Sequence, residues 1–346
     1  MVKKETKMNY LYLDKSDVHK FIESIMKTHA VMAPVKKENL FVFSEIDDPE
    51  EVCIEYMPTI LPPKKYFMPQ KETLGKFTFG KTEFDSSAVE TRPTVIFGVH
   101  TCDIEGIECL DIIFNEEPRD PYFVKRKKDI IIIGYECMKP CDEHATCVTM
   151  DTHNPKAGYD MMITDSGEKY IVHVNSKAAQ ELIQACGFFK KSGNEEDLKS
   201  KLLRLRKDKM KNFTEKLDAK YNEINKVFKK TRESSVWEEV GKRCLSCGNC
   251  TAVCPTCYCF DIYDEPDLSM KEGSRKRTWD SCQLEEFAEV AGGENFREER
   301  SSRQRHRYYR KFDYPVAKYN KFFCVGCGRC TRTCMAKISL VETVND

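Results

Sequence analysis

Two cysteine runs near the C-terminal end of this 346-residue chain have the spacing that most clearly indicates a chemistry. Both follow the pattern C-x2-C-x2-C-x3-C, from Cys244 to Cys254 and from Cys324 to Cys334. Three thiolates on such a loop hold three irons of a cubane, and the fourth cysteine reaches the other cluster. The runs therefore predict two 4Fe-4S clusters with exchanged ligands. The predicted sets are Cys244, Cys247, Cys250 and Cys334 for the first cluster, and Cys324, Cys327, Cys330 and Cys254 for the second.

Zinc is the simplest competing interpretation of these cysteines. Zinc sites usually draw their ligands from separated C-x2-C pairs, whereas each run here places four thiols within eleven residues. The spacing therefore favours iron in clusters, and a zinc-binding interaction module stays as a minor alternative. Because the 18 cysteines bunch at ligand spacing and no secretory signal peptide precedes them, we expect the protein in the reducing cytoplasm.

Three further cysteines follow the first run and form a possible third set: Cys257, Cys259 and Cys282. They supply three ligands of another cubane, whose fourth ligand would be a different residue type or an outside group. Three buried reduced thiols are an equally weighted alternative. An iron without a protein thiolate is free to accept a substrate, so this set also leaves open a cluster-dependent enzyme.

A second additional set lies in the N-terminal half and comprises Cys102, Cys137, Cys141 and Cys147. Cys102 follows one predicted strand and Cys137 the next, and parallel strands end at the sheet edge where α/β proteins place their sites. We therefore predict a metal or a cluster there, against the alternative of ordinary thiols. His100 and His144 flank these cysteines, but the seven histidines form no tight ligand set in the sequence. The remaining thiols, Cys53, Cys109 and Cys186, are predicted to be ordinary core residues.

The elements that must position these residues indicate an α+β protein with two domains. Residues 1–193 predict an α/β domain that includes an amphipathic helix at 18–26 behind a Ser16 cap. A helix at 104–114 lies between the first two of three predicted strands, and this order favours their parallel pairing. The three strands are expected at residues 94–99, 129–134 and 170–174.

The rest of the chain predicts a linker and a cluster-binding domain. Residues 194–235 predict a highly charged linker helix, which either packs on its own protein or binds a partner. Residues 236–346 predict a helical, bacterial-type two-cluster ferredoxin domain with a long insert at 260–320. A loop of that length is usually functional.

Other sequence features exclude several functions. Residues 75–82 match the P-loop pattern G-x4-G-K-T, but a P-loop follows a buried strand and opens a helix, and this segment has neither neighbour. No G-x-G-x-x-G occurs, so we expect nicotinamide chemistry on another subunit. The 56 basic and 56 acidic residues balance, and no apolar stretch is long enough to span a bilayer, so neither nucleic acid nor a membrane is expected. The basic, aromatic stretch at 303–312 is expected to pair with acidic groups or a partner, or to offset cluster charge.

The segments around the second half of the chain resemble the β subunit of cytoplasmic sulfhydrogenases and the iron-sulfur subunit of anaerobic sulfite reductase. The N-terminal half agrees more loosely with the same family, through residues 61–64, 98–103 and 120–122. The closest motifs are Cys-Pro-Thr-Cys-Tyr-Cys at 254–259, Arg-Thr-Trp-Asp-Ser-Cys at 277–282, Val-Ala-Gly-Gly at 290–293, Asn-Phe-Arg at 295–297 and Arg-His-Arg-Tyr-Tyr-Arg-Lys-Phe at 305–312.

This resemblance implies an iron-sulfur electron-transfer subunit. It would join a flavin-bearing, NAD(P)H-oxidising subunit to a catalytic subunit that reduces sulfite or sulfur or acts as a hydrogenase. Flavin and nicotinamide would then be bound by the partner, and we assign no catalytic residue to this chain.

Overall fold

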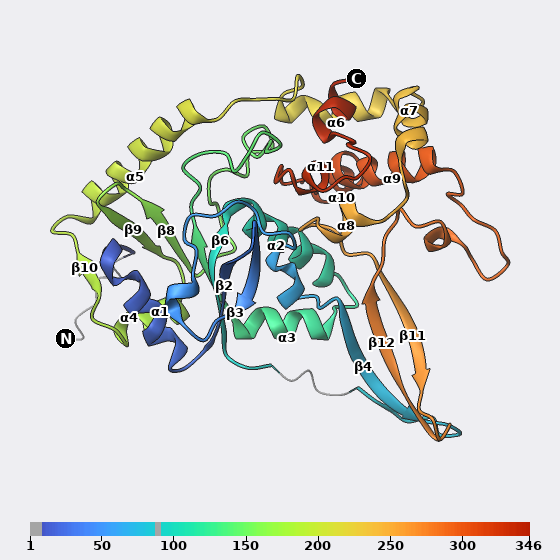
Figure 1. Cartoon of the computed structure of the whole chain (residues 1–346), viewed down its shortest axis with the longest axis horizontal. Coiled ribbons are helices and arrows are strands. Elements are labelled where there is room, and N and C mark those ends of the chain that lie inside the picture. Colours follow the sequence, from blue (N-terminus) through green and yellow to red (C-terminus); the bar gives the residue numbers. More distant parts are fainter. Residues whose placement is uncertain (1–8, 87–90) are drawn as a thin grey trace.

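An eight-stranded mixed sheet organises the N-terminal half of the chain (Figure 1). The computed structural model describes residues 9–86 and 91–346. The strand order is β10-β1-β9-β8-β7-β6-β2-β3, and β2, β6, β7 and β8 run parallel to their neighbours within this group. The strands are β1 (Tyr10–Asp14), β2 (Ala30–Lys37), β3 (Leu40–Glu45), β6 (Thr94–His100), β7 (Ile130–Tyr135), β8 (Met161–Asp165), β9 (Lys169–Val174) and β10 (Phe189–Lys191).

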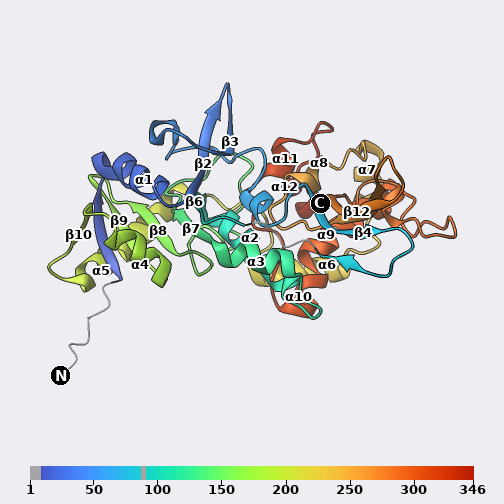
Figure 2. The ribbon, with the colours of Figure 1, turned by 90° about the horizontal axis from the view of Figure 1, so that it is seen from below.

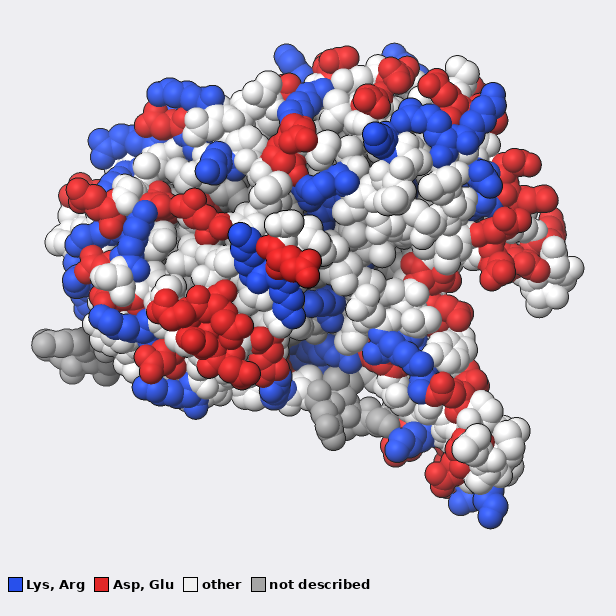
Figure 3. Space-filling model, in the orientation of Figure 1, with Lys and Arg blue, Asp and Glu red and all other residues white. Residues whose placement is uncertain are grey.

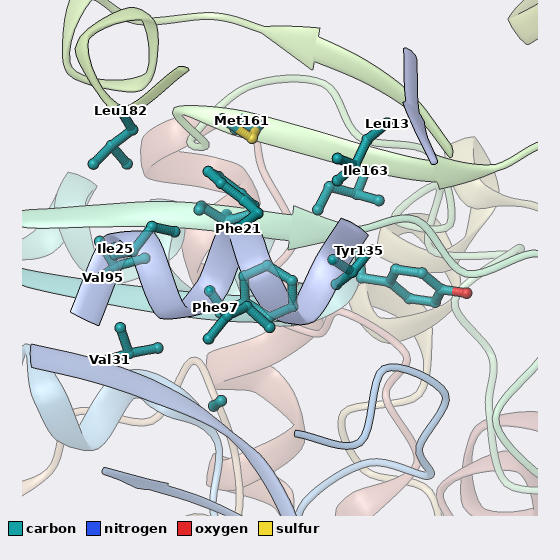
Figure 4. Close-up of a cluster of buried hydrophobic side chains, with 14 of the residues drawn as sticks. Leu13, Phe21, Ile25, Val31, Val95, Phe97, Tyr135, Met161, Ile163 and Leu182 are labelled. Atoms are coloured by element: carbon teal, nitrogen blue, oxygen red, sulfur yellow. The ribbon is translucent and has the colours of Figure 1, made fainter. Parts of the chain in front are cut away.

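Helices cover both faces of this sheet, which makes the N-terminal half an α/β layered structure. Helices α1 (Val18–Met26) and α4 (Lys177–Gln184) bury Phe21 and Leu182 on one face, among the side chains shown in Figure 4. Helices α2 (Thr101–Phe114) and α3 (Pro121–Asp129) cover the other face. The predicted strand-helix-strand unit is confirmed, because β6 and β7 pair in parallel on either side of α2 and α3. The third predicted strand is also present, as β9, but it is antiparallel to β8.

The start of the first helix differs from its prediction. A 3-10 turn, η1 (Lys15–Asp17), precedes α1, and the N-cap residue is Asp17 without a side-chain capping bond. The Ser16 cap was therefore wrong, because Ser16 lies inside the turn rather than at the helix boundary. The amphipathic pattern still sets the helix, since Phe21, Ile22 and Ile25 all face the core.

A second sheet combines strands from both halves of the chain and projects as an arm (Figures 1 and 2). It has the order β11-β12-β4-β5, where β4 (Lys71–Thr78) and β5 (Phe84–Asp85) precede β11 (Phe260–Pro266) and β12 (Glu272–Trp279) by about half of the sequence. The segment that resembles a P-loop lies in this arm. A Cβ on Gly75 would lie 2.4 Å from Phe84 Cζ, so this glycine allows close strand contact instead of phosphate binding.

The charged linker is two helices rather than one. Helix α5 (Glu195–Lys209) continues into η4 (Met210–Asn212), and α6 (Tyr221–Lys230) follows after a non-helical segment at 213–220. That segment crosses from the sheet to the C-terminal helices (Figure 1) and buries Leu217 among them. An extended chain covers more than twice the distance per residue of a helix, so the crossing breaks the predicted helix. The division into units ending at residue 193 and starting at residue 236 stays a prediction.

Short helices and loops form the C-terminal region around an aromatic core. Trp237, Tyr309 and Phe312 are buried there, together with Phe228 from α6. The region contains α7 (Val236–Arg243), α8 (Asn249–Ala252), α9 (Arg300–Phe312), α10 (Tyr314–Tyr319), α11 (Arg329–Arg332) and α12 (Leu340–Asn345). Three other 3-10 helices complete the described chain: η2 (Pro49–Glu51), η3 (Pro63–Tyr66) and η5 (Glu286–Ala288).

The surface mixes both signs of charge. Acidic and basic side chains are interspersed over the face in Figure 3, in keeping with equal totals of 56 each. Within residues 9–86 and 91–346, we find no helix long and apolar enough to cross a membrane.

Candidate functional site

The two cysteine runs fold into closely similar loops. In each loop a glycine precedes a short helix, and Gly248 before α8 and Gly328 before α11 both have φ of 73° and ψ of −8°. This left-handed conformation turns the chain so that the third cysteine of each run, Cys250 or Cys330, enters the first turn of the helix. A Cβ on Gly328 would also lie 2.7 Å from the carbonyl of His144, so this position has room for glycine alone.

Each predicted ligand set lines one cavity. One cavity is lined by Cys244, Cys247, Cys250 and Cys334, and the other by Cys254, Cys324, Cys327 and Cys330. The fourth cysteine of each run therefore borders the cavity of the other run. A single zinc ion would hold its thiolates about 3.8 Å apart, given Zn–S bonds of about 2.3 Å. Among the described residues, the group with all ligand atoms within 4.8 Å of one another contains none of these eight cysteines, so each set surrounds a wider space than one ion needs.

Burial keeps these thiols protonated when no metal binds them. Desolvation raises the pKa of Cys250 and that of Cys327, each to about 12. It also raises the pKa of Cys324. Because thiolate is the ligand form, iron must displace these protons when a cluster forms.

Helix α9 directs a row of buried cations toward the cavities. Arg303, Arg307 and Lys311 are four residues apart, so they share one face of the helix, and all three side chains are buried. Arg307 lines both cavities, and its Nε is buried without a hydrogen-bond partner in the described part of the chain. Although burial lowers the pKa of Arg307, the thiols of Cys250 and Cys330 raise it further, and the net shift is upward. An unpartnered donor between two thiol-lined cavities fits a pair of anionic clusters.

The comparisons with known proteins agree with this arrangement. Residues 243–338 match the 4Fe-4S dicluster domain family. Over 348 aligned residues the chain is 34% identical to sulfhydrogenase 2 subunit beta of Pyrococcus furiosus, and the match covers 98% of each protein. The chain belongs to the sulfhydrogenase β-subunit family. The resemblance predicted from the sequence is thereby confirmed, and the dicluster domain of this family implies two 4Fe-4S clusters. No solved structure matches this member of the sulfhydrogenase β-subunit family.

The third predicted set, Cys257, Cys259 and Cys282, lies beside both cavities. The thiols of Cys259 and Cys282 hydrogen-bond to each other, and Cys257 hydrogen-bonds to Cys254 of the second cavity. Cys257 Sγ also accepts a hydrogen bond of 3.2 Å from Lys311 Nζ. Cys257 and Cys259 border a further hollow of about 290 Å³ next to Cys247. The three residues are therefore neighbours in space, as the sequence suggested.

The N-terminal set is rearranged relative to its prediction. Cys137 and Cys141 come together with His100, and the ligand atoms of all three lie within 4.8 Å of one another. Cys102 and Cys147 are outside this group in the described chain. Cys147 lies against the second cysteine run, where a Cβ on Gly326 would be 2.5 Å from its amide nitrogen.

Sequence reasoning missed the parts of the site that depend on tertiary contacts. His100 was noted only as a neighbour of the thiols, although its position as the last residue of a predicted strand gave the same signal as Cys102. Arg307 had a signal in the four-residue spacing of cations along the stretch at 303–312. The thiols predicted to be ordinary core residues each donate to a main-chain carbonyl: Cys53 to Glu51, Cys109 to Phe322 and Cys186 to Ile183.

Proposed function

We propose that this chain relays single electrons through two 4Fe-4S clusters inside a larger oxidoreductase. The observation that carries the proposal is the lining of the two cavities, because each one is bordered by four cysteines drawn from both runs of a dicluster domain. The first cluster would bind to Cys244, Cys247, Cys250 and Cys334, and the second to Cys324, Cys327, Cys330 and Cys254. A bound cluster accepts and releases one electron at a potential set by its surroundings.

The protein's own contribution is to hold the ligands and to tune the charge around them. Gly248 and Gly328 fix the two loops through their left-handed conformation. Arg307, between the cavities, and Lys311, beside the second cavity, place buried positive charge where anionic groups would bind. Arg329, at the start of α11, forms a two-bonded ion pair with Asp103 of α2, at 2.5 and 2.7 Å, with both side chains fully buried. This pair attaches the second cysteine loop to the sheet domain.

We extend the proposal to a third cluster at Cys257, Cys259 and Cys282. The support is their proximity to one another and to both cavities, together with the donors that already face their sulfurs. Gln283 Nε2 donates to Cys282 Sγ at 3.4 Å, and Lys311 Nζ donates to Cys257 Sγ at 3.2 Å. A chain with three cubanes would carry about twelve irons, compared with about eight for two.

The partners follow from the family. The relative in Pyrococcus furiosus is named as a subunit of sulfhydrogenase 2, and this chain aligns with nearly all of it. We infer that this chain joins a flavin-bearing, NAD(P)H-oxidising subunit to a catalytic hydrogenase or to a sulfite or sulfur reductase subunit. Purification of the chain from its native cells, with mass spectrometry of the proteins that accompany it, tests this inference. Recovery of the chain without any redox subunit would contradict it.

The exchanged ligand assignment has a spectroscopic test. Cys247→Ser and Cys334→Ser change different runs but the same proposed cluster, so both variants should lose about four irons and show the same residual EPR spectrum after reduction. Cys327→Ser should lose the other cluster and leave the complementary spectrum. Cys186→Ser, which changes a thiol far along the sequence from both runs, is the matched control and should keep the full iron content.

Two outcomes would contradict the assignment. One is a Cys334→Ser spectrum that resembles that of Cys327→Ser, because each run would then bind its own cluster. The other is a full iron and sulfide content in any of the three ligand variants.

A further inference from the structure

The carboxyl ends of two parallel strands bring a histidine and two cysteines together outside the dicluster region. His100 is the last residue of β6 and is paired in register with Tyr135, the last residue of β7. Cys137 follows two residues after Tyr135, and Cys141 lies at the end of the short loop that comes next. The imidazole and the two thiols converge, with all their ligand atoms within 4.8 Å of one another.

The spacing of these atoms suits one tetrahedral ion. Cys141 Sγ lies 3.9 Å from His100 Nδ1. With Zn–S bonds of about 2.3 Å and Zn–N bonds of about 2.0–2.1 Å, tetrahedral angles place a sulfur and a nitrogen ligand about 3.6 Å apart. The observed separation is therefore within a few tenths of an ångström of the one that a bound ion requires.

Neighbouring residues hold the ligands in place. The ring of His100 is buried and stacks on Tyr56 at a centroid distance of 3.9 Å and an interplanar angle of 14°. The hydroxyl of Tyr56 donates to the carbonyl of Gly98 at 2.7 Å, which fixes the stacking partner. Lys209 Nζ donates to the carbonyl of Cys137 at 3.2 Å while it pairs with the buried carboxylate of Glu136 at 2.7 Å. A site supported in this way is preorganised before any ion binds.

The three ligands border a large cavity. It has a volume of about 720 Å³, and its lining includes His100, Cys137 and Cys141 together with Tyr56 and Met138. That volume is typical of small-molecule sites. An ion held by the three side chains would therefore keep one coordination position open to this space.

We propose that His100, Cys137 and Cys141 bind one zinc-class divalent ion whose fourth position takes water or a small thiol. Three protein ligands with one open position are the arrangement of catalytic zinc sites, and Cys2His is one of the known ligand sets. A cubane bound to all four cysteines of the N-terminal set is the competing site. The structure favours the single ion, because Cys102 and Cys147 lie outside the converging group and the histidine lies inside it. The proposal is independent of the electron relay and its clusters.

The test uses the full-length protein with its clusters, purified anaerobically and incubated with ZnCl2 before extensive dialysis. We expect about one zinc per chain, and zinc-edge X-ray absorption that shows two sulfur neighbours at about 2.3 Å and nitrogen at about 2.0–2.1 Å. Cys141→Ser should lower the zinc content at least tenfold and leave iron and sulfide unchanged. Cys186→Ser, a matched half-buried thiol elsewhere in the same domain, should leave both metals unchanged.

Three results would overturn the proposal. The first is a wild-type protein that retains no zinc, or zinc without sulfur neighbours, and this measurement needs no variant to fold. The second is zinc that persists in the Cys137→Ser, Cys141→Ser double variant, which would show adventitious binding. The third is a loss of iron and sulfide on Cys141→Ser, which would show a cluster in this place.

Discussion

Replacement of Arg307 by methionine should make the clusters harder to reduce. The side chain lines both thiol-lined cavities, is buried, and has an Nε without a partner in the described chain. A positive charge in that position stabilises each cluster more after it has gained an electron than before. Loss of the charge therefore lowers the reduction potential, while methionine preserves much of the side-chain volume.

The size of the effect follows from Coulomb's law. A unit charge roughly 7 Å from the added electron, at an effective dielectric constant of about 20, contributes about 2.4 kcal/mol. Because 1.36 kcal/mol corresponds to about 59 mV for a one-electron couple, the expected shift is about −100 mV. Redox titration followed by EPR measures the potential of each cluster. Both potentials should fall, since the side chain borders both cavities.

Two further variants decide whether charge is the cause. Arg305→Met removes an arginine from the same helix, but that side chain is partly exposed and pairs with Glu233 at 3.4 Å, so its potential shift should be under about 20 mV. Arg307→Lys retains the charge and should restore most of the wild-type potential. Equal shifts in Arg305→Met and Arg307→Met, or an Arg307→Lys variant as low as Arg307→Met, would refute the reasoning.

Two other predictions concern stability. Arg329→Met leaves the carboxylate of Asp103 buried without its partner and should lower the free energy of unfolding by about 3–5 kcal/mol in anaerobic urea titrations, whereas Arg329→Met with Asp103→Leu should be less destabilised; a loss under about 1 kcal/mol for the single variant would contradict this. Burial, aided by the charge of Arg297, lowers the pKa of His306 to about 4, so the unfolded chain binds more protons than the folded chain between pH 6.5 and 4. Stability should therefore fall as the pH drops through this window, and His306→Gln should remove about 1–2 kcal/mol of that loss because the ring is only partly buried. Parallel stability-against-pH curves for the two proteins would count against this explanation.

The cluster loops could be predicted because their chemistry depends on local spacing. Cysteines at fixed intervals and the glycines between them, Gly248 and Gly328, determine each loop within about a dozen residues. The same is true of β6 and β7, whose short apolar runs indicate buried strands without knowledge of the rest of the chain. The family resemblance also rested on such local motifs, and the match to the Pyrococcus furiosus protein confirms it.

Contacts between distant segments could not be predicted in the same way. The pairing of β4 with β12 joins residues about 200 positions apart, and no local pattern indicates it. The linker breaks between α5 and α6 because Leu217 is buried in the C-terminal core, although its spacing fits a continuous helix. The entry of His100 into the N-terminal group depends on the register between β6 and β7, which sequence periodicity does not specify.

The sequence by itself determined which residues carry the chemistry: eight cysteines at cluster spacing, and further thiols in two additional sets. Ligand type and short-range spacing are properties of the chain, so they are legible without a structure. Only the tertiary structure decided how those residues are grouped. It placed Cys334 and Cys254 at the cavities of the opposite runs, directed Arg307 between them, and replaced two predicted thiols with His100 at the sheet edge. The physical reason is that side chains from distant segments meet only when packing and strand register bring them together.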